Sequence, residues 1–137
     1  MKNTMRCLGV IALVALIGFA LVACDNGMTS ELDGNWESTY GMAIRMSGGG
    51  AVITRLPTTG YWGDAANKGY IRINSQKFRN IRKTGNYTWE GENLIVRYSG
   101  SSATGIEWQS TTISLSSNNQ TFTTYNSGNS TGSWTRR

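Results

Sequence analysis

The sequence predicts an all-β domain over residues 34–137, built as a small antiparallel up-and-down β-barrel of eight or nine strands. Three observations support this prediction. First, Thr, Ser, Gly, Asn and aromatic residues dominate, Pro57 is the only proline, and no sustained 3.6-residue period is present. Second, short alternating apolar runs are separated by turn residues. Third, the connections are short except for residues 57–69, which favours the barrel over the alternative, a β-sandwich with long Greek-key crossings.

The expected strands are short runs, and we list them by residue range: 35–40, 42–47, 51–56, 70–74, 86–91, 93–99, 106–116, 121–126 and 132–137. In the first run Trp36, Ser38 and Tyr40 share one face, because side chains alternate along a strand. Residues 75–83 form either a further strand or a connection. The run 106–116 forms either one long strand or two short ones.

Polar segments mark the expected turns. Ser47–Gly50 turns the chain because glycine adopts positive φ freely. Glu90-Gly91-Glu92-Asn93 is expected to be a hairpin turn, and residues 117–120 are expected to lead into the run 121–126. Residues 57–69 make a loop that is long for a meander.

The N-terminal segment has the order of a secretion signal. Lys2 and Arg6 precede an apolar run of about 15 residues, which is short for a membrane span and ends in Leu21-Val22-Ala23-Cys24. This ending resembles the lipobox of bacterial lipoprotein signal peptides. The resemblance implies that residues 1–23 are removed and that Cys24 is acylated. The alternative is an uncleaved N-terminal helix.

The lipoprotein resemblance implies a protein anchored by lipid to a membrane of the bacterial cell envelope, with its domain outside the cytoplasm. More than one acyl chain is needed for stable anchoring. Residues 24–33 would be the lipidated cysteine and a polar tether, which reaches roughly 30 Å at most. Asp25 resembles a signal for retention at the inner membrane in enteric-type bacteria, but other bacteria read this position differently, so the choice of membrane stays open.

The mature chain has few groups suited to catalysis. It has no histidine, Cys7 leaves with the leader and Cys24 carries lipid, so neither a disulfide nor a free thiol remains. These absences exclude the commonest general base, the usual zinc ligands and thiol nucleophiles. We therefore expect a protein that is not an enzyme and has no metal or cofactor. Removal of Lys2 and Arg6 lowers the formal net charge from +5 to +3, which does not indicate nucleic-acid binding.

The motif Gly34-Asn35-Trp36 resembles the Gly-x-Trp that opens the first strand of lipocalins and lipocalin-like domains. The resemblance implies that Trp36 closes the base of the barrel and that a basic residue of the last strand packs across its ring. Arg136, which shares a face with Trp134, is the first candidate for this partner and Arg137 the second. The alternative is that both tryptophans are ordinary core residues of another β fold.

The loop 57–69 is the candidate ligand site. Tyr61 and Trp62 stand between glycines, which suits a lid or stacking platform over a barrel mouth. The alternative is that these rings fold back and cap the core. With 14 Leu, Ile and Val from residue 32 onward, we expect any internal cavity to be small and lined by aromatic and hydroxyl groups.

A basic stretch follows the loop, and its side chains are Lys68, Arg72, Lys77, Arg79, Arg82 and Lys83. This stretch suits an anionic ligand, which Arg72 would contact, or an acidic partner or lipid headgroups. The alternative is a solvated face. We expect a non-catalytic module that binds a small or amphipathic ligand. The rival is an envelope structural or interaction protein that binds another macromolecule through its outer surface.

Overall fold

The computed structural model describes residues 31–137, so the signal-peptide and Cys24 predictions lie outside the described residues. Eight antiparallel strands form a closed up-and-down barrel in sequence order, and the last strand pairs with the first. The strands and one short helix are β1 (Gly34–Ser38), β2 (Ala43–Ser47), β3 (Gly50–Arg55), α2 (Gly60–Asn67), β4 (Gln76–Gly85), β5 (Thr88–Ser99), β6 (Ser102–Leu115), β7 (Thr121–Asn126) and β8 (Asn129–Arg136). The predicted barrel is confirmed, and the sandwich is excluded.

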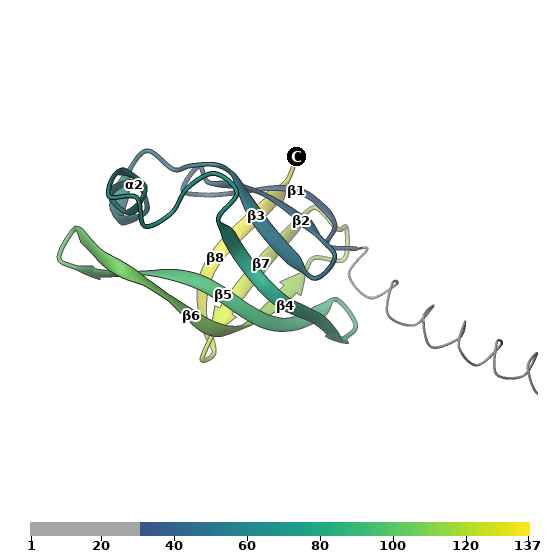
Figure 1. The fold of residues 1–137 in the computed structure, drawn as a ribbon. Helices are drawn as coiled ribbons and strands as arrows, with labels where there is room; N and C mark the ends of the chain where they lie inside the picture. Colours follow the sequence, from purple (N-terminus) through teal and green to yellow (C-terminus); the bar gives the residue numbers. More distant parts are fainter. Residues whose placement is uncertain (1–30) are drawn as a thin grey trace, which may run out of the picture.

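The barrel has two different ends because consecutive antiparallel strands alternate in direction. The β1–β2, β3–β4, β5–β6 and β7–β8 connections lie at one end, which we call the mouth. The start of β1 and the end of β8 lie at the other end, which we call the base. Figure 1 shows α2 beside the β5–β6 hairpin at the left, away from the start of β1 at the right.

The base is closed by the predicted tryptophan and arginine. The Cζ of Arg136 lies 4.2 Å from the centroid of the Trp36 ring, and Trp36 is fully buried. The guanidinium also donates hydrogen bonds to the backbone carbonyls of Glu31, Asp33 and Asn119, at 2.7–2.8 Å. A Cβ at Gly34 would stand 2.7 Å from the Nη1 of Arg136, and the φ of Gly34 is +136°. The glycine of the Gly-x-Trp motif therefore leaves room for the arginine.

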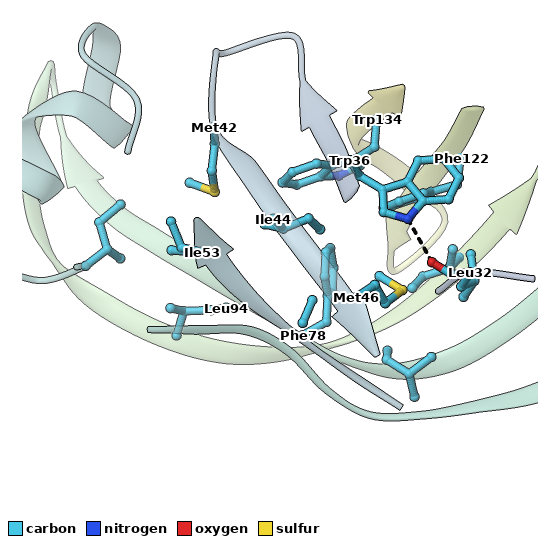
Figure 2. Packing of buried hydrophobic residues seen from close by; sticks show 14 of the residues in the cluster. Leu32, Trp36, Met42, Ile44, Met46, Ile53, Phe78, Leu94, Phe122 and Trp134 are labelled. Carbon is cyan, nitrogen blue, oxygen red and sulfur yellow. Dashed lines mark hydrogen bonds between the residues drawn. The ribbon is translucent and has the colours of Figure 1, made fainter. Parts of the chain in front are cut away.

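Buried aromatic residues of the core pack against Trp36 at the base. Trp36 meets Phe122 edge to face with ring centroids 4.7 Å apart, and Phe122 stacks on Trp134 at 5.7 Å. The Nε1 of Trp36 donates a hydrogen bond to the backbone carbonyl of Leu32 at 2.8 Å, drawn as a dashed line in Figure 2. Leu32 is itself fully buried. Residues 31–33 thus belong to the folded domain, although the sequence placed them in the polar tether.

Two predicted elements in the first half of the chain differ from the structure. The segment 57–69 contains a helix, α2, because Trp62 and Ala65 bury against the barrel while Asp64 and Lys68 pair one turn apart at 2.8 Å. The predicted strand 70–74 is wrong. Its backbone leaves the sheet, since Asn74 has a φ of +68°, and only Ile71 of its two isoleucines is buried.

The predicted hairpin at residues 90–93 is also wrong. β5 runs through these residues, and the turn lies at residues 86–87, where Tyr87 has a φ of +56°. Gly91 serves a different purpose from the one the sequence suggested. A Cβ there would lie 2.4 Å from the Cδ1 of Ile81, so the glycine permits β4 and β5 to approach closely. β4 includes residues 76–83 of the uncertain segment 75–83, and β6 is one long strand.

Candidate ligand-binding site at the barrel mouth

A cavity of about 440 Å³ lies at the mouth end, between the β1–β2 turn, α2, β5 and β8. A smaller space of about 20 Å³ lies next to it and shares several wall residues with it. We call the two together the mouth cavity. The side chains that characterise its wall are Tyr40, Tyr61, Trp62, Lys77, Asn93 and Thr131. The wall contains the aromatic and hydroxyl groups that the sequence predicted for any cavity in this barrel. It also contains the amide of Asn93, the ammonium of Lys77 and the aliphatic side chains of Ile95 and Val96.

Three tyrosines from separate elements form the rim of the mouth cavity. Tyr61 of α2 stacks on Tyr98 at the end of β5, with centroids 4.9 Å apart and ring planes 22° apart. Tyr40 of the β1–β2 turn lies 6.4 Å from Tyr61. Burial, together with the neighbouring Tyr40, raises the pKa of Tyr61 above its ordinary value. Tyr40 and Tyr98 are 48% and 60% exposed, so apolar ring surface faces solvent at the entrance.

The sequence allowed two roles for Tyr61 and Trp62, a lid over the barrel mouth or a cap on the core, and the two rings differ in the role they take. Trp62 is only 8% exposed and belongs to the hydrophobic core, so it caps the barrel. It also forms part of the cavity wall. Tyr61 is half-buried and stands at the rim. Trp62 is therefore a fixed wall of the site, and Tyr61 is the residue at its entrance.

Lys77 lies inside the barrel and not on the basic surface where the sequence placed it. Ala51 of β3 pairs with Phe78 of β4, but the next residue, Val52, pairs with Gln76. Lys77 is therefore the extra residue of a β-bulge, which sets it and Phe78 on the same side of the strand. Both side chains are buried, Lys77 being 3% exposed. Simple alternation would have pointed Lys77 outward.

The ammonium group of Lys77 has neutral partners. Its Nζ donates a hydrogen bond to the Oδ1 of Asn93 at 2.5 Å and another to the backbone carbonyl of Leu94. It also lies 4.5 Å from the centroid of the Trp62 ring, a cation–π distance. Burial lowers the pKa of Lys77 from 10.5 to about 7. Such a shift follows from the cost of holding a charge away from water.

The other basic side chains do not gather around the site. Arg72 is exposed in the connection before β4 and does not line the mouth cavity. Three of the remaining side chains form ion pairs: Lys68 with Asp64, Arg79 with Glu92, and Lys83 with Glu31. Arg82 is exposed and stands opposite Glu90 on β5. Of the six basic side chains, three are thus paired with acids, Lys77 is buried, and Arg72 and Arg82 are exposed.

The sequence reasoning missed the contribution of Tyr40, Tyr98 and Thr131 to the site. Tyr40 was placed on the face of Trp36, but the chain leaves β1 at Ser38 and carries the ring to the rim. The only available signal was the position of Tyr40 and Tyr98 at the ends of predicted strands.

Other kinds of site find little support in the part of the chain that the structure describes. Residues 31–137 contain no group of three or more His, Cys, Asp or Glu side chains placed to hold a metal ion. Within the same range, no helix has both the length and the hydrophobicity needed to span a membrane. Comparison with protein-family models, with curated proteins and with solved structures finds no significant match to this chain.

Proposed function

We propose that this protein is a non-catalytic binding module that takes up a small amphipathic ligand in the mouth cavity. The observation that carries the proposal is the cavity of about 440 Å³ at the open end of a closed barrel. Its volume falls within the range of about 300–1,000 Å³ typical of small-molecule sites. The interior of an eight-stranded barrel is just wide enough to be filled by side chains or to hold one small ligand.

The wall chemistry supports an amphipathic ligand. The rings of Tyr61, Tyr98 and Trp62 offer apolar faces on which a ring or chain can pack. The deeper wall offers polar groups, including the buried Thr124 and the ammonium of Lys77. A molecule with an apolar part toward the rim and a polar group toward the interior satisfies both regions.

We also infer that the domain is tethered through a lipid on Cys24, at a bacterial cell-envelope membrane. The support is the order of charged start, apolar run and Leu-Val-Ala-Cys in residues 1–24. Because β1 starts at the base, a tether entering there leaves the mouth at the opposite end of the barrel. The ligand would then enter from the aqueous side and not from the bilayer.

Ligand binding is tested with 2-phenylethanol, a small neutral amphipath that carries one ring and one hydroxyl group. The full chain is held in lipid nanodiscs and titrated by calorimetry, with empty nanodiscs as the blank. We expect saturable binding to the wild type and at least a tenfold loss in Thr131→Trp, whose new ring fills the cavity. Thr135→Trp is the matched control, since Thr135 is exposed on the same strand outside the cavity wall. Equal binding by both variants would place the site elsewhere.

The lipid anchor is tested by metabolic labelling of the expressing bacterium with a palmitate analogue. We expect label in the wild-type protein and none in Cys24→Ser, with Cys7→Ser labelled normally. Label that is unaffected by Cys24→Ser would exclude the proposed anchor.

A further inference from the structure

The charge on Lys77 is unbalanced within the mouth cavity. Among residues 31–137, no side chain that lines this cavity is acidic, and Lys77 is the only lysine or arginine in its wall. Within the same part of the chain Lys77 forms no ion pair, and its two acceptors are neutral oxygens. An ammonium group has three donor hydrogens. Two are used by Asn93 and Leu94, so one hydrogen is left for a further partner.

The acids on the surrounding elements do not face the cavity. Glu90 of β5 is exposed and does not line the cavity. The other acids on α2, β5, β6 and β1 pair as follows: Asp64 with Lys68, Glu92 with Arg79, Glu107 with Arg97, and Glu37 with Arg55 and Arg137. Hydrogen bonds from these cations hold the pKa values of Asp64, Glu92 and Glu107 below their usual range. The remaining ionisable groups that face the cavity are Tyr40, Tyr61 and Tyr98. None of these groups is a carboxylate, so the cavity wall offers Lys77 no carboxylate counterion.

A buried lysine without a counterion has two ways to avoid the cost of its charge: it releases its proton, or it meets an anion. In the protein without ligand, burial lowers the pKa of Lys77 to about 7, so roughly half of the molecules carry the charge at neutral pH. A ligand that brings a negative charge to the Nζ would favour the protonated form, while a neutral ligand would not. Thr131 and Thr124 also line the deeper space, but their hydroxyl hydrogens are used within the protein: Thr131 donates to the Oγ1 of Thr124 at 3.0 Å and Thr124 to the backbone carbonyl of Gly132 at 3.3 Å. The Nζ of Lys77 is therefore the donor that the anion would meet.

We propose that the ligand of the mouth cavity is an amphipathic anion whose acid group, such as a carboxylate, pairs with the Nζ of Lys77, and that the protein takes up a proton at this residue when the ligand binds. This inference rests on the proposed function, because it names the ligand class of the same site. The apolar part of the ligand lies against the rings of Trp62 and Tyr61, and its acid group is directed toward Lys77 and Asn93.

The proposal predicts a particular dependence of affinity on pH. A carboxylic acid titrates near pH 4, so such a ligand stays charged from pH 6 to pH 9. Over this range the free protein progressively loses the Lys77 proton that the ligand needs. We therefore expect the affinity for a carboxylate to be constant below about pH 6 and to fall up to tenfold per pH unit above about pH 7. Near pH 8, binding should take up close to one proton.

The test compares phenylacetate with 2-phenylethanol, which has nearly the same shape but no charge. Both are titrated by calorimetry against the full chain in nanodiscs at pH 6, 7, 8 and 9. The titrations are repeated in buffers of different ionisation enthalpy, which gives the number of protons taken up. We expect phenylacetate to bind more tightly at pH 6, to lose affinity as the pH rises, and to take up protons, while 2-phenylethanol does none of these.

Variants provide a second readout. Lys77→Met should abolish the pH dependence and weaken phenylacetate binding at pH 6 at least tenfold, while 2-phenylethanol binding changes less than threefold. Lys83→Met is the matched control, because Lys83 lies on the same strand and pairs with Glu31 outside the cavity. The proton uptake of the wild type needs no variant, so the test still decides if Lys77→Met does not fold.

The outcomes separate this inference from the proposed function. If 2-phenylethanol binds but phenylacetate binds no better at pH 6 and takes up no proton, the anion proposal is overturned and the binding module stands. If neither ligand binds at any pH, the proposed function itself fails. If Lys83→Met removes the pH dependence and Lys77→Met does not, the anion contacts the outer surface and the assignment to Lys77 is wrong.

Discussion

Replacement of Lys77 by methionine gives the most direct test of the buried ammonium group. The side chain is 3% exposed, and burial lowers its pKa from 10.5 to about 7. The pKa is lower in the folded than in the unfolded chain. Between about pH 7 and pH 10.5 the unfolded chain therefore binds a proton at Lys77 that the folded chain does not. The free energy of unfolding must then increase as the pH rises through this window.

The size of the effect follows from the two pKa values. A difference of one pKa unit corresponds to about 1.4 kcal/mol, so the full shift amounts to roughly 5 kcal/mol. Between pH 7.5 and pH 9.5 the wild type should gain about 2 to 3 kcal/mol of stability from Lys77 alone. Lys77→Met has no group that titrates at this position and lacks the gain. In Lys77→Met the carbonyl oxygens of Asn93 and Leu94 each lose a donor, which costs about 1–3 kcal/mol per group at every pH.

The assay is urea unfolding of the full chain, followed by tryptophan fluorescence at pH 7.5, 8.5 and 9.5. The quantity compared is the difference in unfolding free energy between the wild type and Lys77→Met, in which titrations common to both proteins cancel. Lys83→Met serves as the control, since this half-buried lysine pairs with Glu31 and should leave the pH dependence of the wild type unchanged. If the wild type and Lys77→Met change in parallel with pH, Lys77 is not a buried charge and the reasoning is refuted.

Three further substitutions test the packing of the base and the sheet, each by urea unfolding at pH 7.5. Gly34→Ala should lower the free energy of unfolding by about 2–4 kcal/mol, because the new Cβ meets the Nη1 of Arg136 at 2.7 Å and φ is +136°. Gly48→Ala is the control, since this glycine has a φ of +60° but open space around it, and should lower the free energy of unfolding by about 1 kcal/mol. Arg136→Met should lower the free energy of unfolding by about 2–4 kcal/mol, because it loses the cation–π contact and three hydrogen bonds. Arg137→Met removes only an exposed ion pair and should lower the free energy of unfolding by less than about 1 kcal/mol. Equal losses for the two arginines would contradict the role given to Arg136. Gly91→Ala should lower the free energy of unfolding by about 1–3 kcal/mol, because the added Cβ would overpack against β4. An unchanged free energy of unfolding would contradict the close approach of the two strands as the reason for this glycine.

Much of the fold was predictable because it depends on local pattern. The run 42–47 was expected to be a strand, and the alternate residues Met42, Ile44 and Met46 of this run are all buried. The absence of a helical period and the short connections indicated a closed meander. One error occurred where a sequence that resembles a turn has another cause. Gly91 follows an acidic residue as in a hairpin, yet its lack of a Cβ is needed for the close approach of Ile81.

The site was predictable only in part. The unusual segment with Tyr61 and Trp62 does line the cavity, because two large rings in a long connection must pack against something nearby. Arg72, close in sequence, does not line it. Tyr40 and Tyr98 come to the rim from other elements, and only the closure of the barrel brings them within ring contact of Tyr61.

The sequence by itself determined the class of fold, the closure of the base by Trp36 and Arg136, and the aromatic and hydroxyl character of any cavity. These features follow from the period of apolar residues, from one short motif and from composition. The tertiary structure alone decided which lysine enters the interior. A single extra residue in the pairing of β3 and β4 turns Lys77 from the outer face to the cavity wall. Alternation along one strand cannot reveal such a shift, because the register belongs to the pair of strands and not to either sequence alone.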